Sequence, residues 1–234
     1  FSYGQKRVLR DLGFSIRGGE IFGLLGANGA GKTTTLRLLS GLLTPGQILV
    51  GGHDLALEPE QAKSKLGFLA DNVALFDQLT GREHLQYLAS LRSMPFRQSE
   101  QRIDRLLKVL ELESVANELC HSYSLGMTRK LGLASALLHQ PEVLLLDEPF
   151  SGLDPPGRHR LKQLLAQMAT QGVAVLLSTH ELSVAEEVCG RLGILSHGGL
   201  VLTGTPEDLR EQHGDLEFAF MAHTQTRDLG DLDF

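Results

Sequence analysis

The sequence predicts an α/β fold with a mainly parallel sheet. Residues 21–25, 143–146 and 173–177 form short runs that are apolar at almost every position, which is typical of strands covered on both faces in a parallel sheet. Between these runs lie segments with apolar residues at helical spacing, such as residues 103–110 and 161–168. Strands that alternate with helices indicate this fold class.

Composition narrows the kind of protein. The chain has 234 residues, of which 42% are hydrophobic, and a net charge of -6 from 22 Lys and Arg against 28 Asp and Glu. This balance argues against a protein that mainly neutralises nucleic-acid phosphates. The 2 cysteines cannot build a disulfide framework, and no apolar run reaches the roughly 20 residues that a membrane-spanning helix needs. The start at Phe1 lacks the pattern of a signal peptide, so we expect a cytoplasmic globular protein.

Two regions depart from the alternation of strands and helices. Residues 5–18 and 47–55 contain short strand patterns with glycine turns, which indicates a small antiparallel β subdomain near the N-terminus. Residues 77–138 are helical in pattern without a convincing strand and predict a helical subdomain inserted into the core. We expect the main domain to cover residues 1–213 and a C-terminal tail to cover residues 214–234.

A phosphate-binding loop follows the first apolar run. The segment Gly26–Thr33 matches the pattern G-x-x-x-x-G-K-[ST] between a predicted strand and a predicted helix, which is the context this motif requires. Backbone N–H groups of such a loop surround phosphate oxygens, Lys32 can reach the β and γ phosphates, and the Thr33 hydroxyl can ligate Mg²⁺. The predicted nucleotide-binding residues of this loop are Gly26, Ala27, Asn28, Gly29, Ala30, Gly31, Lys32, Thr33 and Thr34.

An acidic pair follows the second apolar run. Residues 143–146 lead directly into Asp147 and Glu148, so Asp147 is placed at the end of a buried strand, where it can hold the Mg²⁺ shell. Glu148 comes immediately after it and is placed to orient and deprotonate a water molecule. Phosphoryl transfer needs mainly positioning and charge stabilisation. We therefore expect Lys32 and Glu148 to be catalytic residues.

Three further motifs narrow the class of phosphate-loop protein. Residues 124–130 (Ser-Leu-Gly-Met-Thr-Arg-Lys) precede the acidic pair, residues 151–155 (Ser-Gly-Leu-Asp-Pro) follow it, and residues 178–180 (Ser-Thr-His) end the third apolar run. In this order and spacing they resemble the signature, D-loop and H-loop of the ATP-binding-cassette (ABC) ATPases. The resemblance covers residues 3–209 and implies a P-loop NTPase core that uses ATP and Mg²⁺.

The resemblance also implies roles for single residues. His180 would contact the γ-phosphate as a third catalytic residue, and Tyr3 would stack on adenine. Ser124 and Gly126 would cap the ATP bound by a second copy of the chain in a head-to-tail dimer. Asp71 stands where the family usually has a glutamine that meets Mg²⁺, and its carboxylate can also offer oxygen to a hydrated Mg²⁺.

The function that the resemblance implies is ATP hydrolysis that powers a separate transmembrane permease. The signature and the stretch 207–221 resemble ATPases that are paired with exporter-type permeases. The permease would contact the segment 72–100, including Phe76, Leu79 and Tyr87, and would hold the chain on the cytoplasmic face of the inner or plasma membrane.

Two alternatives remain open at this point. A soluble ABC-type ATPase acting on nucleic acid or the ribosome would carry long coiled coils, a second cassette or basic extensions, and none of these is present. An unrelated phosphate-loop kinase or GTPase would leave the signature unexplained and would need an Asn-Lys-x-Asp guanine motif, which the sequence lacks. We expect no nucleic-acid partner.

Overall fold

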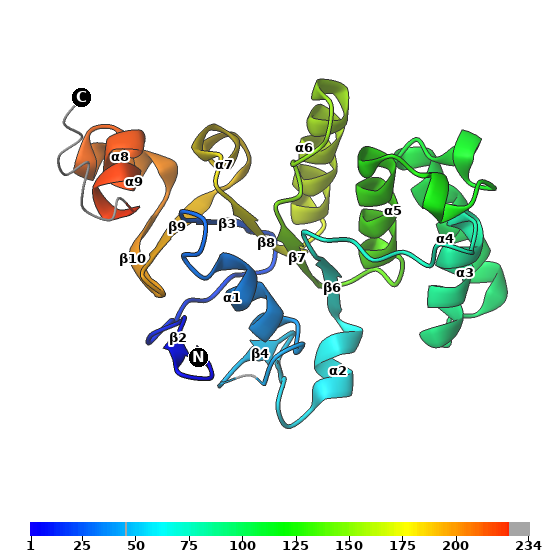
Figure 1. Ribbon diagram of the computed structural model, residues 1–234, viewed down its shortest axis with the longest axis horizontal. Coiled ribbons are helices and arrows are strands. Elements are labelled where there is room, and N and C mark those ends of the chain that lie inside the picture. The colour runs from blue at the N-terminus through cyan, green and yellow to red at the C-terminus, as the bar shows by residue number, and fades with distance from the viewer. Residues whose placement is uncertain (45, 225–234) are drawn as a thin grey trace.

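A six-stranded sheet forms the centre of the protein in the computed structural model, which describes residues 1–44 and 46–224 (Figure 1). Its strand order is β10-β9-β3-β8-β7-β6, with every neighbouring pair parallel except β10 and β9. The strands are β1 Ser2–Tyr3, β2 Lys6–Arg7, β3 Ile21–Leu25, β4 Leu49–Val50, β5 His53–Asp54, β6 Leu66–Leu69, β7 Val143–Asp147, β8 Ala174–Thr179, β9 Arg191–Ser196 and β10 Gly199–Gly204. The predicted α/β class is confirmed.

Helices cover the two faces of this sheet (Figure 1). The helices α1, α2, α5, α6 and α7 contact strands of the sheet, whereas α3 and α4 pack against α5. The helices of the described residues are α1 Lys32–Leu39, α2 Pro59–Ser64, α3 Gly81–Leu91, α4 Phe96–Val109, α5 Leu125–Leu137, α6 Pro155–Thr170, α7 Leu182–Val188, α8 Pro206–His213 and α9 Leu216–Thr224. Among the described residues, no helix combines the length and the apolar character that crossing a bilayer requires.

The strands bury side chains on both faces because their residues alternate between two cores. In β3, Ile21 and Leu25 belong to the core that α5, α6 and α7 cover, whereas Phe22 and Leu24 belong to the core under α1 and α2. All five residues of β3 are buried. Each buried Leu or Phe contributes roughly 1.5–3 kcal/mol to folding, so the sheet holds its strand ends, and the loops that follow them, in fixed positions.

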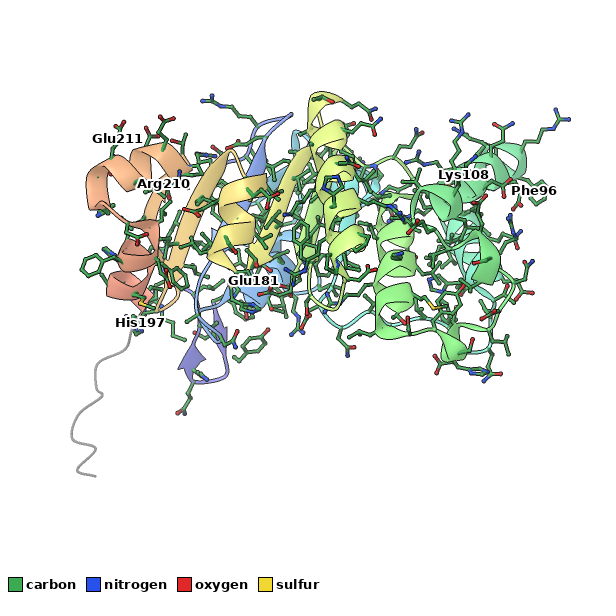
Figure 2. The ribbon with its side chains drawn as sticks, turned by 90° about the horizontal axis from the view of Figure 1, so that it is seen from above. Phe96, Lys108, Glu181, His197, Arg210 and Glu211 are labelled. Atoms are coloured by element: carbon green, nitrogen blue, oxygen red, sulfur yellow. The ribbon has the colours of Figure 1, made fainter. Side chains whose placement is uncertain are left out.

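The inserted helical region is confirmed. Residues 77–138 contain α3, α4 and α5 together with two short 3₁₀ turns at Glu113–Val115 and Cys120–Ser122, and their only strand-type pairing is an isolated bridge between Thr80 and Leu119. The predicted apolar stripe of α4 faces the core. Figure 2 shows this helical region at one end of the molecule, where Phe96 and Lys108 are labelled, and α8 and α9 at the other.

The small antiparallel region differs in detail from the prediction. The structure forms two separate ribbons, β1 with β2 and β4 with β5, each of two residues per strand. Within the predicted stretch 5–18, Lys6 and Arg7 form β2, and the described residues 8–18 contain no further strand. The apolar side chains of Phe14 and Ile16 still pack against the core under α1. Side-chain packing, and not strand pairing, therefore positions this stretch.

The C-terminal part is more ordered than a tail. Residues 216–224 form α9, and Leu216 and Ala219 are buried. Residues 225–234 of the predicted tail lie outside the described residues. The predicted division into a main domain of residues 1–213 and a tail of residues 214–234 stays a prediction.

Candidate functional site

Three loops meet at one edge of the sheet. β3 lies next to β8, and β8 lies next to β7, so the carboxyl ends of these three strands are neighbours. The register pairs Leu25 with Thr179 and Asp147 with Ser178. In an open parallel sheet, ligands bind in the crevice outside the carboxyl ends of the strands. The phosphate loop, the acidic pair and His180 all follow these strands, so the fold brings them together as predicted.

The phosphate loop turns directly from β3 into α1. Gly29 has a φ of 83° and Gly31 a φ of 114°, which are conformations that favour glycine. A side chain at Gly31 would also meet the Leu9 side chain at 2.6 Å. Ala27 and Asn28 are exposed on the lip of the loop, and no side chain caps the N-terminus of α1. The first N–H groups of α1 therefore remain available to an anion.

Lys32 lies inside the loop, with only 7% of its surface exposed. Its ammonium donates hydrogen bonds to the carbonyl oxygens of Gly26 at 2.7 Å and Ala27 at 3.3 Å, and it lies 3.9 Å from Glu148 Oε1. Burial lowers the pKa of Lys32, while the negative charges of Glu148 and Asp147 oppose that shift. The cation is thus held at the position where a phosphate group would enter the loop.

Asp147 is buried at the end of β7, with 1% exposure. Its Oδ1 accepts a 2.5 Å hydrogen bond from the Ser178 hydroxyl, whereas its Oδ2 is buried without a hydrogen-bond partner. A buried carboxylate oxygen without a partner is costly. Mg²⁺ prefers oxygen ligands of this kind, so the unpartnered oxygen fits the predicted metal role of Asp147.

Glu148 adopts a left-handed backbone conformation, with a φ of 48°, which costs an ordinary residue roughly 1–2 kcal/mol. Its N–H is 3.2 Å from both the hydroxyl and the carbonyl oxygen of Ser178. This turn aims the Glu148 side chain back toward the loops, where Oε1 lies 2.9 Å from Nδ1 of His180. The predicted base and the predicted γ-phosphate sensor are therefore in direct contact.

The remaining predicted residues lie apart from this centre. Ser124 is exposed and caps α5, where its hydroxyl accepts a hydrogen bond from the Met127 N–H at 3.3 Å. A Cβ at Gly126 would lie 3.5 Å from the Gly152 carbonyl oxygen, in the loop after Glu148. Figure 1 shows α5 and α1 on different sides of β7. Tyr3 lies on β1, is 44% exposed and contacts the Phe1 ring edge-on at 5.0 Å.

Asp71 has a partner that the sequence did not indicate. Its Oδ1 accepts a 2.8 Å hydrogen bond from Nη2 of Arg129 on α5, while Nη1 of Arg129 donates to the carbonyl oxygen of Glu148 at 2.7 Å. The Asp71 side chain is 56% exposed and that of Arg129 is 7% exposed. The predicted contact of Asp71 with Mg²⁺ stays a prediction.

Sequence reasoning missed two functional residues of the site. Ser178 ties Asp147 to Glu148, and Arg129 holds the Glu148 carbonyl. A signal for each was present. Ser178 is the polar end of a predicted buried strand, and Arg129 lies four residues before the buried Leu133 on the same helix, which places it on the inward face.

The chemistry of these groups suits a metal-bound nucleoside triphosphate. The loop N–H groups and Lys32 offer positive charge to phosphates, and the Thr33 hydroxyl and Asp147 offer oxygen ligands. Glu148 provides a carboxylate beside them, in reach of a water that attacks a phosphorus atom. The arrangement supports phosphoryl transfer to water.

Sequence comparisons agree with this geometry. The family model described as "ABC transporter" matches residues 9–151. The chain is 34% identical to the linearmycin resistance ATP-binding protein LnrL of Bacillus subtilis, over 91% of this chain and 69% of that protein. It is 37% identical to the daunorubicin resistance ATP-binding protein DrrA3 of Streptomyces coeruleorubidus, over 91% and 68%.

The chain also resembles part of a longer protein and two solved structures. The probable multidrug ABC transporter ATP-binding protein YbhF of Escherichia coli is 37% identical over 92% of this chain, but the match spans only 37% of YbhF. The structure described as an ATP binding subunit of an ABC transporter superposes with a TM-score of 0.84 at 35% identity, covering 91% of this chain and 89% of that one. A dimeric post-hydrolysis structure of the ATP-binding cassette MJ0796, bound to ADP and Pi, gives a TM-score of 0.77 at 25% identity, covering 85% and 90%.

Proposed function

Because this chain is an ATPase domain that belongs to the ABC transporter family, we propose that it powers a separate membrane permease, of the exporter type, by hydrolysing ATP between two copies of itself. The observation that carries the catalytic part is the contact of Glu148 with His180 beside the buried Lys32. The drug-resistance names of LnrL and DrrA3 support the exporter assignment. These names favour the transporter over the nucleic-acid alternative.

Each ATP site would take residues from both copies. Ser124 is exposed and Gly126 is half-buried at the start of α5. A serine hydroxyl and a helix N-terminus both favour phosphate. The dimeric state of the MJ0796 cassette supports a pairing of this kind. In this arrangement the start of α5 in one copy faces the γ-phosphate held by the other copy.

The chemistry at the site follows from the positions of the side chains. The Lys32 ammonium, already desolvated inside the loop, neutralises charge on the β and γ phosphates. Thr33 and Asp147 would hold Mg²⁺, which would supply further positive charge at the site. Glu148 accepts a proton from the attacking water, and the His180 ring, 2.9 Å from Glu148 Oε1, orients that carboxylate. Tyr3, which is exposed on β1, would stack on adenine.

The permease would bind the exposed edge of the helical region. Phe76 and Tyr87 are 47% and 43% exposed and pack edge-on, with ring centroids 5.0 Å apart. Leu79 lies half-buried in the same loop. Exposed aromatic side chains in one patch are typical of a protein interface. This contact would hold the chain on the cytoplasmic face of the membrane.

The substitution Glu148→Gln tests the proposed chemistry. Glutamine keeps the shape and a hydrogen bond to His180 but cannot accept a proton, so we expect ATP binding to persist and turnover to fall at least about 100-fold. In the presence of ATP, the variant should then accumulate as a dimer of twice the 25.5 kDa chain mass. Hydrolysis assays, together with light scattering in the presence of ATP, measure both outcomes. Normal turnover in this variant would contradict the assignment of Glu148 as the base.

A further inference from the structure

Arg129 joins three parts of the molecule through one side chain. It extends from the second turn of α5 in the helical region, it donates to the backbone carbonyl of Glu148 in the nucleotide core, and it pairs with Asp71 in the loop after β6. Its side chain is 7% exposed. A guanidinium with this burial needs a counter-charge and accepting oxygens, and Asp71 and the Glu148 carbonyl supply them.

A contact at the Glu148 carbonyl can fix the backbone conformation of that residue. Glu148 has a left-handed backbone conformation, and conformations of this kind persist only where the surroundings fix them. On the N–H side, Ser178 holds the residue at 3.2 Å. On the carbonyl side, the Ser151 N–H at 3.2 Å and the Arg129 guanidinium at 2.7 Å hold it. Of these contacts, only the one from Arg129 comes from the helical region.

The fork geometry of the guanidinium explains why both partners matter. Nη1 donates to the Glu148 carbonyl and Nη2 to Asp71 Oδ1, while Nε is buried without a hydrogen-bond partner. The ion pair with Asp71 therefore fixes the plane of the guanidinium and aims Nη1 at the carbonyl. A lysine has a single ammonium group and could not donate to the Glu148 carbonyl and to Asp71 in this fixed planar geometry.

We propose that Arg129 is the positioning residue for Glu148 and that Asp71 is its charge partner, so that the placement of α5 sets the placement of the carboxylate that activates water. This proposal rests on the assignment of Glu148 as the base. A shift of α5 away from the core would release the Glu148 carbonyl. ATP hydrolysis would then slow, although the phosphate loop and Lys32 stay intact.

Steady-state kinetics on single and double variants test this role. We expect Arg129→Met to lower kcat for ATP about 10-fold or more, with KM for ATP changed by less than about 2-fold, because the contact acts on the base and not on nucleotide binding. Arg129→Lys should lose activity as well, because a lysine ammonium lacks the planar guanidinium that donates to both partners. Asp71→Asn should lower kcat about 3-fold. The double variant that combines Arg129→Met with Asp71→Asn should be no slower than Arg129→Met alone, because the two residues act as one unit.

The matched control is Lys130→Met. Lys130 is the next residue on α5 and pairs with Glu111 at 3.4 Å in an exposed ion pair, so kcat should stay at the wild-type value. Thermal unfolding of every variant separates lost folding from lost positioning. If Arg129→Met does not fold, Asp71→Asn and Arg129→Lys carry the test, and unchanged kcat in both would overturn the proposal.

Two further measurements separate positioning from other roles. In the Glu148→Gln background, Arg129→Met should lower the residual rate no further, because no carboxylate is left to position; a further 10-fold loss would show a general structural role and overturn the proposal. The Mg²⁺ concentration for half-maximal activity should be the same in Asp71→Asn and wild type. A large increase, with kcat restored at saturating Mg²⁺, would instead identify Asp71 as a metal contact and overturn its role as the charge partner.

Failure of this proposal and failure of the proposed function give different results. If Glu148→Gln hydrolyses ATP normally, the base assignment is wrong whatever Arg129 does. If Glu148→Gln is inactive and Arg129→Met has wild-type kcat, only the positioning role is wrong.

Discussion

Lys32 shows how the fold prepares one residue for phosphate. Its ammonium is almost entirely removed from water, its pKa is lowered by that burial, and the carbonyl oxygens of Gly26 and Ala27 together with the charges of Glu148 and Asp147 compensate. A buried cation that meets a phosphate anion forms charge-assisted hydrogen bonds, which are the stronger kind. The residue is therefore expected to contribute to nucleotide binding itself.

The substitution Lys32→Ala should weaken ATP binding. Hydrogen bonds to charged groups contribute about 1.5–3 kcal/mol, so we expect the Kd for ATP to rise roughly 10- to 100-fold, as measured with a fluorescent ATP analogue. The control is Lys108→Ala, because Lys108 is exposed at the far end of the helical region (Figure 2). Equal affinity in Lys32→Ala and wild type would contradict the role of Lys32.

The individual residues of the site were predictable to different degrees. Lys32, Asp147, Glu148 and His180 follow from motifs, and the strand order brings all four to one edge of the sheet. The partner of Asp71 was not predictable, because Arg129 lies 58 positions along the chain. Contacts at such separation depend on how α5 packs against the core, and local sequence patterns do not contain that information.

Helices and strands were predictable where burial sets their pattern. β3, β7 and β8 are buried on both faces and have continuous apolar runs. β6 has only four residues and was not predicted. β10 alternates between half-buried and exposed residues at the edge of the sheet, which leaves a weak apolar signal. The fully buried strands that fix the site were therefore predictable from the sequence, and the two edge strands of the sheet were not.

The junction of α5 with β6 contains a buried histidine with a measurable consequence. His139 follows the end of α5, and its Nε2 lies 3.0 Å from the Leu66 carbonyl oxygen, to which it donates. Burial lowers the pKa of His139 to about 4, and the charge of Arg92 adds to this shift. The ring is neutral in the folded protein at pH 7, whereas an unfolded chain has a histidine pKa of about 6.5.

Acid should therefore destabilise this junction. Between about pH 4 and 6.5 the unfolded chain binds more protons than the folded one, so the free energy of unfolding decreases as the pH falls through this window. Urea unfolding should show that the free energy of unfolding falls between pH 7 and pH 5 by about 1–2 kcal/mol more in wild type than in His139→Gln. Glutamine keeps a hydrogen-bond donor but does not titrate. The exposed His121→Gln is the control. An equal loss in wild type and His139→Gln would refute this pH dependence.

At the scale of the whole molecule, the proposed ATP site combines two surfaces of the chain. The phosphate loop, the acidic pair and His180 gather at one edge of the sheet. The exposed Ser124 at the start of α5 offers a second surface, and α5 and α1 lie on different sides of β7 (Figure 1). A two-fold dimer that pairs these two surfaces forms two equal sites. Closing and opening of such a dimer would move the helical region and any permease bound to it.

Complementation between two inactive variants tests this shared site most directly. Lys32→Ala removes the phosphate contact in its own chain. Gly126→Asp places a negative charge at the start of α5, and the change fits sterically because a Cβ there lies 3.5 Å from the nearest atom, the Gly152 carbonyl oxygen. Each variant alone should be inactive. In a mixed dimer, one site combines an intact Lys32 from one chain with an intact Gly126 from the other.

An equal mixture of the two variants should regain about a quarter of the wild-type ATPase rate, because half of the dimers are mixed and each mixed dimer has one complete site. Differently tagged copies show by co-purification that mixed dimers form. If mixed dimers form and the rate stays at the level of the separate variants, the two chains do not share their ATP sites and the account is contradicted.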